Sequence, residues 1–280
     1  TLRTAEAVFR NTRDSRIGHL RSRNAQAANE PRIRALTHTD PATVERVLRD
    51  DLIAEQSLDN RIDGISFCDE SGKFLSSAAA DPTLNLSGFE AGISSIVKQA
   101  LREGESRDAT VLVGSRMFDV VATPIMISGQ PAGALSFAIE IGGAVAKEFK
   151  QLTRSEITFI ANGQVVASTI GDPALHAKLA GMFSESLPPS RTLSPRPIEL
   201  KAEHFLGIAG HLQAPAPNQV LGYLLLFSYE EALADLGAMR RSLLVVGVLG
   251  ALLSSLIAWL YVRRITEPLR RLRCGAEAVE

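Results

Sequence analysis

Four polar residues stand within two otherwise apolar stretches, and their types suit the binding of a small solute. Arg116, Asp119 and Thr123 belong to one stretch, and Ser136 belongs to the next. Alternation along an extended strand puts Asp119 and Thr123 on one face, and we expect Ser136 of the neighbouring strand to line the same face. The planar guanidinium of Arg116 suits a carboxylate. These residues form a candidate site for a small anionic or polar solute; alternatively, Arg116 and Asp119 are solvated residues at a sheet edge.

Signatures of catalysis are absent from the sequence. It contains no G-x-S-x-G, H-E-x-x-H, P-loop or G-x-G-x-x-G motif, and Cys68 and Cys274 have no metal-ligand spacing. His204 and His211 are explained better as ordinary surface imidazoles than as metal ligands. We predict no catalytic residue, no metal and no cofactor. Thirty basic residues balance 31 acidic ones, so the chain lacks the excess of positive charge that is typical of nucleic-acid-binding proteins.

One apolar run is long enough to cross a membrane. Residues 243–262 contain no charge and would reach about 30 Å as a helix, the thickness of a hydrocarbon core. A buried core helix is the alternative. Five arginines follow the run, which predicts a cytoplasmic C-terminus and an outside location for everything before residue 240. Translocation of that part suggests a further membrane helix upstream of Thr1. The arginines are Arg263, Arg264, Arg270, Arg271 and Arg273.

The N-terminal residues have helical periodicity. Apolar residues form one stripe over the first 27 positions, and Pro31 predicts a break. A second helix is predicted to start at Asp40–Pro41, with Asp40 as its cap. Two alternatives remain open: both are surface helices, or the first is a stalk whose stripe pairs with a second copy. The stripes comprise Leu2, Ala5, Phe9, Ile17, Leu20 and Ala27 in the first helix, and Val44, Val47, Leu48, Leu52 and Ile53 in the second.

An internal repeat predicts the architecture of the middle of the chain. "ISFCDESGKFLSS" (Ile65–Ser77) and "ITFIANGQVVAST" (Ile157–Thr169) align without a gap as strand, turn, strand, with Ser71-Gly72 and Asn162-Gly163 in the turns. Each copy continues into a helical insert and a long hairpin. We predict two tandem α+β modules whose antiparallel sheets have the same strand order. The inserts span residues 89–102 and 174–183, and the hairpins span 118–141 and 205–230.

This order of elements resembles the double Cache sensor domains of bacterial transmembrane receptors. The resemblance implies a long N-terminal helix, two PAS-like modules with the ligand pocket in the membrane-distal one, between sheet and insert, and then the membrane helix. "RRITEPLRRL" (Arg263–Leu272) resembles the start of a HAMP linker, which implies a role in signal transmission for Glu267 and Pro268. The implied boundaries are 1–61 for the N-terminal helices, 62–150 and 151–238 for the two modules, 239–262 for the membrane helix and 263–280 for the linker.

The function implied is detection of an extracytoplasmic solute, with a conformational signal passed across the bacterial inner membrane. Histidine kinases, diguanylate or adenylate cyclases and chemoreceptors have such linkers before their output domains, and HAMP helices imply a homodimer. In the second module, "GYLLLFSY" (222–229) fills both strand faces with bulky groups, so we expect the site in the first module. The Tyr- and Trp-rich signature of amino-acid-binding relatives is not visible. The alternative function is a periplasmic protein-interaction platform without a small ligand.

Overall fold

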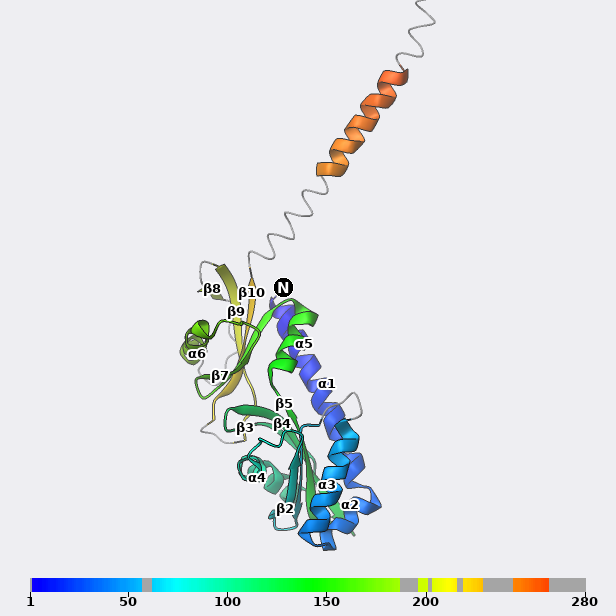
Figure 1. Ribbon diagram of the computed structural model, residues 1–280, viewed down its shortest axis with the longest axis vertical. Coiled ribbons are helices and arrows are strands. Elements are labelled where there is room, and N and C mark those ends of the chain that lie inside the picture. Colours follow the sequence, from blue (N-terminus) through cyan, green and yellow to red (C-terminus); the bar gives the residue numbers. More distant parts are fainter. Residues whose placement is uncertain are drawn as a thin grey trace, which may run out of the picture. The chain divides into compact units, whose positions relative to one another are not determined.

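The computed structural model describes residues 2–56, 62–186, 196–200, 203–215, 219–228 and 244–261. Contacts divide the chain into two compact units, Thr1–Phe227 and Ser228–Glu280. The first unit contains two five-stranded antiparallel sheets with helices against them, so the α+β class and the two modules are confirmed (Figure 1).

The N-terminal part of the first unit is helical and precedes the first sheet. The long helix ends at Ala28, and Pro31 starts the next helix, as the sequence predicts. The elements of this helical part are α1 (Leu2–Ala28), α2 (Pro31–Ala35), a 3-10 turn (Leu36–His38) and α3 (Pro41–Gln56). The first module consists of β1 (Gly64–Asp69), β2 (Phe74–Ala79), α4 (Leu86–Glu103), β3 (Arg107–Val113), β4 (Arg116–Ile127) and β5 (Gln130–Glu140).

The second module repeats the order of the first. Its sheet is ordered β7-β6-β10-β9-β8, and the first is ordered β2-β1-β5-β4-β3, which confirms the predicted common strand order. The outer strands β3 and β8 were missing from the sequence prediction. The elements are α5 (Gly143–Thr153), β6 (Glu156–Ala161), β7 (Gln164–Ser168), α6 (Pro173–Ser186), β8 (Arg196–Leu200), β9 (Glu203–His211) and β10 (Leu221–Ser228).

Turn and cap residues act as their types predict. Gly72 and Gly163 have φ of +81° and +76° in the two strand turns, a conformation that glycine adopts without strain. Asp40 Oδ1 accepts hydrogen bonds from the amides of Ala42 and Thr43 and so caps α3. One assignment was wrong: Ile53, which we placed on the apolar face of α3, is 62% exposed.

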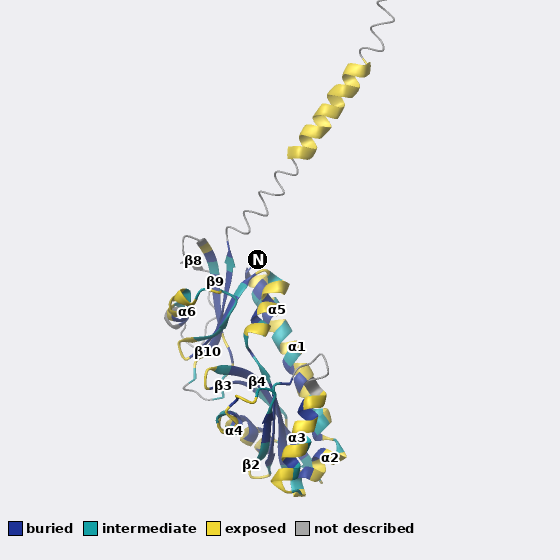
Figure 2. Ribbon diagram, in the orientation of Figure 1, coloured by how far each residue is buried: buried dark blue, intermediate teal, exposed yellow. Residues whose placement is uncertain are grey.

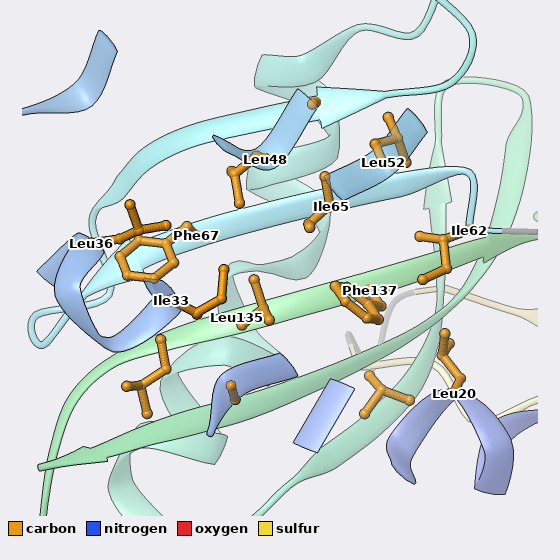
Figure 3. Close-up of a cluster of buried hydrophobic side chains, with 14 of the residues drawn as sticks. Leu20, Ile33, Leu36, Leu48, Leu52, Ile62, Ile65, Phe67, Leu135 and Phe137 are labelled. Carbon is orange, nitrogen blue, oxygen red and sulfur yellow. The ribbon is translucent and has the colours of Figure 1, made fainter. Parts of the chain in front are cut away.

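Helices cover both faces of the first sheet. On one face, α1 and α3 pack over a cluster that includes Leu48, Phe67 and Phe137, and Figure 3 shows these side chains between the helices and the strands. On the other face, α4 buries Phe89 and Ile93 against the sheet. The strands are therefore largely buried from both sides (Figure 2). A sheet buried on both faces leaves room for a ligand only where small side chains or polar groups interrupt the packing.

The apolar stripe of α1 is buried within this chain. Ile17 and Leu20 join the core of the first module, while Leu2 and Phe9 join the core of the second. The idea that this stripe pairs with a second copy was therefore wrong, because its own modules already cover it. The helix contacts strands of both sheets (Figure 1). It is positioned to link the two modules mechanically.

The second described unit contains one helix, over residues 244–261. It is apolar and long enough to cross a membrane, and none of its residues is buried among the described residues. Residues 262–280 lie outside the described residues. The predicted HAMP segment, with Glu267, Pro268 and the five arginines, therefore stays a prediction.

Candidate ligand-binding site

Strand register separates the four predicted site residues into two pairs. Thr123 lies opposite Leu135, whereas Ser136 lies opposite Ala122. Residues directly opposite each other in an antiparallel pair point to the same side of a sheet. Asp119 and Thr123 therefore face α1, and Ser136 faces α4. The expectation that all three share a face was wrong, because a register shift of one residue moves a side chain to the other face.

A row of serines crosses the sheet beneath α4. Ser66 of β1 lies opposite both Ser136 of β5 and Ser77 of β2. Ser77 Oγ donates to Glu90 Oε1 of α4 at 2.7 Å. The hydroxyls of Ser66 and Ser136 are buried and have no hydrogen-bond partner among the described residues. Since buried hydroxyls are normally paired, these two are available to a polar ligand group.

Small side chains surround this row and let α4 approach closely. Ala134 and Ala138 flank Ser136 on β5, and both are almost fully buried. A Cβ at Gly64 would lie 3.3 Å from the ring of Phe89, so the helix packs directly on the sheet here. The sequence pattern of small residues left open whether this face is vacant or closely packed. The structure shows close packing, so a ligand can reach the serines only if α4 moves outward.

Arg116 lies on the α4 side of the sheet but is already paired. Its Nε donates to Glu140 Oε1 at 3.0 Å, and its Nη1 donates to Asp81 Oδ2 at 2.7 Å. Its guanidinium also lies 5.5 Å from the ring centre of Phe118. The hydrogen bonds that Arg116 donates to Glu140 raise the pKa of Arg116 above its usual range. A ligand carboxylate would have to displace one of these two acids.

Asp119 is buried at a junction with α1. Its Oδ1 accepts hydrogen bonds from Arg13 Nη2 at 2.7 Å and from Thr110 Oγ1 at 2.7 Å. Asp119 is only 5% exposed, so the alternative that it is a solvated edge residue was wrong. The backbone amide of Thr110 also donates to the carbonyl of Gln213, in the loop after β9. This junction joins α1, the first sheet and the second module.

The sequence prediction did not include Arg13. The signal was its position: Arg13 follows Phe9 by four residues and precedes Ile17 by four, so it lies within the apolar stripe of α1. A charged residue at such a position requires a buried partner. Thr123, the other predicted residue on this side, shares a hydrogen bond of 2.9 Å with Ser106.

Reactive groups outside these residues include possible metal ligands and the thiol of Cys68. Among the described residues, no group of three or more His, Cys, Asp or Glu side chains is placed to hold a metal ion. Cys68 is buried next to the serine row, and burial raises the pKa of its thiol to about 12. The thiol is therefore protonated at neutral pH and is a poor nucleophile.

Residues 8–228 match the profile of the dCache_3 family, described as the double sensory domain of two-component sensor kinases. A search of curated proteins gave no match. The periplasmic domain of LuxQ from Vibrio cholerae has a similar fold, with a TM-score of 0.54 and 13% identity over 82% of this chain and 100% of that one. The DctB histidine kinase sensor domain from V. cholerae has a TM-score of 0.50 and 12% identity, covering 81% and 95% of the two chains.

Proposed function

Because the chain belongs to this family of double sensory domains, we propose that it detects a small polar solute between the first sheet and α4. It is a sensory domain in signal transduction. The location of this site is proposed from the two buried hydroxyls of Ser66 and Ser136, which have no hydrogen-bond partner among the described residues. Both have donor and acceptor capacity, and Glu90 adds a carboxylate beside them. This combination suits a solute with hydroxyl or amine groups.

Detection requires that the solute bind two conformations differently. In the described conformation, α4 covers the serines, so the binding conformation has α4 displaced from the sheet. A solute that pairs with Ser66 and Ser136 stabilises the displaced conformation and shifts the population toward it. Arg116 lies on the same side and contributes by exchanging Glu140 or Asp81 for a ligand carboxylate. Asp119 and Thr123, on the other side, pass the change to α1 rather than contacting the solute.

The signal then leaves through the membrane helix. We propose boundaries of 1–61, 62–150 and 151–238 for the N-terminal helices and the two modules, with a homodimeric receptor in the bacterial inner membrane. The modules are periplasmic, and residues 263–280 begin a cytoplasmic HAMP linker at Glu267 and Pro268. The apolar helix over residues 244–261 supports this arrangement, and arginines follow it.

Alanine substitution of Ser136 tests the site. Removing an unpaired buried hydroxyl leaves stability unchanged or raises it by up to about 1 kcal/mol, because its desolvation cost disappears. The same change should abolish the rise in melting temperature caused by a solute identified from a panel of small polar metabolites. Thermal unfolding with and without the solute measures both effects. Ser155→Ala, a buried serine of the second module, is the matched control and should keep the ligand response.

Two outcomes contradict the proposal. Retention of the ligand response in Ser66→Ala and Ser136→Ala would place the site elsewhere. No response to any solute, together with stable capture of a periplasmic protein, would favour the interaction platform. The close packing of α4 over Ala134 and Ala138 is the observation consistent with that second function.

A further inference from the structure

Arg116 ties the loop that leads into α4 to the first sheet. This loop covers residues 80–85, between the end of β2 and the start of α4. Arg116 Nη1 of β4 donates to Asp81 Oδ2 in the loop at 2.7 Å, and Arg116 Nε donates to Glu140 Oε1 of β5 at 3.0 Å. Glu140 belongs to the sheet, whereas Asp81 belongs to the segment that precedes the covering helix. The guanidinium therefore joins the sheet to the approach of α4.

The loop is internally hydrogen-bonded, so we expect Asp81 and the start of α4 to move together. Asp81 Oδ1 accepts hydrogen bonds from the amide of Thr83 at 2.9 Å and from its hydroxyl at 2.7 Å. Asn85 Oδ1 then accepts from the amide of Gly88 and caps α4. Leu84, between these two turns, is buried in the same apolar cluster as α4. A displacement of Asp81 is therefore passed to the first turn of the helix.

The guanidinium of Arg116 is held in place by contacts other than the one with Asp81. It donates two N–H groups to the carboxylate of Glu140, and it lies 5.5 Å from the ring centre of Phe118. The ring of Phe118 in turn packs edge-on against Phe89 of α4, with 6.0 Å between centroids. Because Arg116 is already fixed, pairing with Asp81 costs little further side-chain entropy. The pair is 25% and 42% exposed, and this geometry lets it contribute more than an isolated surface ion pair.

The end of α4 that follows this loop also covers the serine row. Glu90, in the second turn of α4, accepts from Ser77 Oγ at 2.7 Å. Ser66 lies opposite Ser77 on the next strand, and Ser136 lies opposite Ser66 on the strand after that. While Asp81 stays bound to the sheet, the start of α4 stays over these hydroxyls. Displacement of this end of the helix is therefore what uncovers the row.

We propose that the Arg116–Asp81 ion pair is a latch that holds α4 closed over the serine row. The inference rests on the proposed function, because it concerns the displacement of α4 that exposes Ser66 and Ser136. The apparent affinity of a protein for its ligand falls with the fraction of molecules in the binding conformation. The strength of this single ion pair therefore regulates how readily the solute site opens.

Asp81 is a sharper test of the latch than Arg116. Arg116 is also proposed to meet a solute carboxylate, so its substitution changes two things at once. In Asp81→Asn, the side-chain oxygen can still accept from the amide of Thr83 and keep the turn. The negative charge that binds Arg116 is lost. The matched control is Asp108→Asn, which removes the aspartate of the Arg21–Asp108 pair on the α1 side of the sheet.

Thiol labelling by a maleimide measures the opening of α4 without any solute. The reporter is Ser66→Cys in the 280-residue chain in detergent, with Cys68→Ala and Cys274→Ala, because position 66 is fully buried beneath α4. We expect Asp81→Asn to speed labelling by about threefold or more, the factor that a modest ion pair contributes to an opening equilibrium. Asp108→Asn should leave the rate unchanged. Thermal unfolding of each variant separates local opening from a loss of global stability.

A double-mutant cycle shows whether the effect belongs to the pair. Arg116→Gln should also speed labelling, and combining it with Asp81→Asn should add little, since either change alone breaks the latch. An unchanged labelling rate in Asp81→Asn overturns the proposal, as does equal acceleration in Asp108→Asn. Fully additive effects of the two latch substitutions overturn it as well. None of these outcomes depends on the solute, whereas the proposed function fails if Ser66→Ala and Ser136→Ala keep the ligand response.

Discussion

Two arginines of α1 pair with aspartates of the first sheet in different surroundings. Arg13 and Asp119 meet in a buried junction, where the two side chains are 19% and 7% exposed. Arg21 and Asp108 meet near the surface, where the side chains are 48% and 24% exposed. Water screens the Arg21–Asp108 pair but not the Arg13–Asp119 pair. The two ion pairs should therefore contribute differently to the free energy of unfolding.

Substitution of each aspartate by asparagine separates these consequences. We expect Asp119→Asn to lower the free energy of unfolding by about 3 kcal/mol, because Arg13 keeps a buried charge without its counter-ion. Asp108→Asn should change it by no more than about 0.5 kcal/mol, because the pair is exposed. Urea unfolding of residues 1–228 measures both. Equal effects of the two substitutions would show that Asp119 does not hold α1 to the sheet.

At the level of single residues, the sequence predicted one side-chain direction correctly but did not predict the partners of the four polar residues. Alternation correctly placed Asp119 and Thr123 on one side of β4. The same reasoning placed Ser136 on the wrong side of the sheet, because alternation within one strand does not show which residues of the neighbouring strand lie opposite. Arg116 was expected to be free for a ligand, yet its acids come from residues 81 and 140, whose proximity depends on the complete sheet.

Two helices contain a glycine at different kinds of position, one at the C-terminal end of α4 and one in the interior of α1. Gly104 ends α4 in the left-handed conformation, with φ of +67°, and its amide donates to the carbonyl of Ala100. Gly18 lies in the interior of α1, and a Cβ there would meet nothing within 4 Å. The first glycine is required by backbone geometry, whereas the second weakens its helix.

The same substitution should therefore have opposite effects at these two positions. Gly104→Ala should lower the free energy of unfolding by about 1 kcal/mol, because a Cβ disfavours positive φ. Gly18→Ala should raise it by about 0.5 to 1 kcal/mol, because alanine is the better helix former. Thermal and urea unfolding of residues 1–228 report the sign of each change. A loss of stability in Gly18→Ala would show that this face of α1 is covered in solution.

Elements with local signals were predicted well. The cap at Asp40, the break at Pro31 and the two strand turns all depend on residues close in sequence. The strands β3 and β8 were missed because each lies at the outer edge of its sheet, paired only with β4 or β9, and their order is set by long-range pairing. The double attachment of α1 was also missed, since its stripe is equally consistent with a coiled coil.

At the scale of the whole molecule, burial of the α1 stripe changes where a dimer can form. Phe9 is 5% exposed within the second-module core, so it cannot contact a partner chain. The helix over residues 244–261 has no such cover among the described residues, and its large side chains are exposed, including Leu252 and Leu256. If the receptor is a homodimer, we expect this helix to provide a contact within the membrane.

Disulfide crosslinking in membranes tests this contact. Single cysteines at successive positions from residue 246 to 258, in a background with Cys68→Ala and Cys274→Ala, should form dimers with a period of three to four residues, because one helix face meets its copy. Ile53→Cys is the control for random collision, since Ile53 is 62% exposed on α3 and outside the membrane helix. Uniform crosslinking along the helix, at the level of the Ile53 control, would mean that the helices do not pair. A periodic pattern, with its maxima on one face, would establish the parallel arrangement by which two copies could pass a signal through the membrane together.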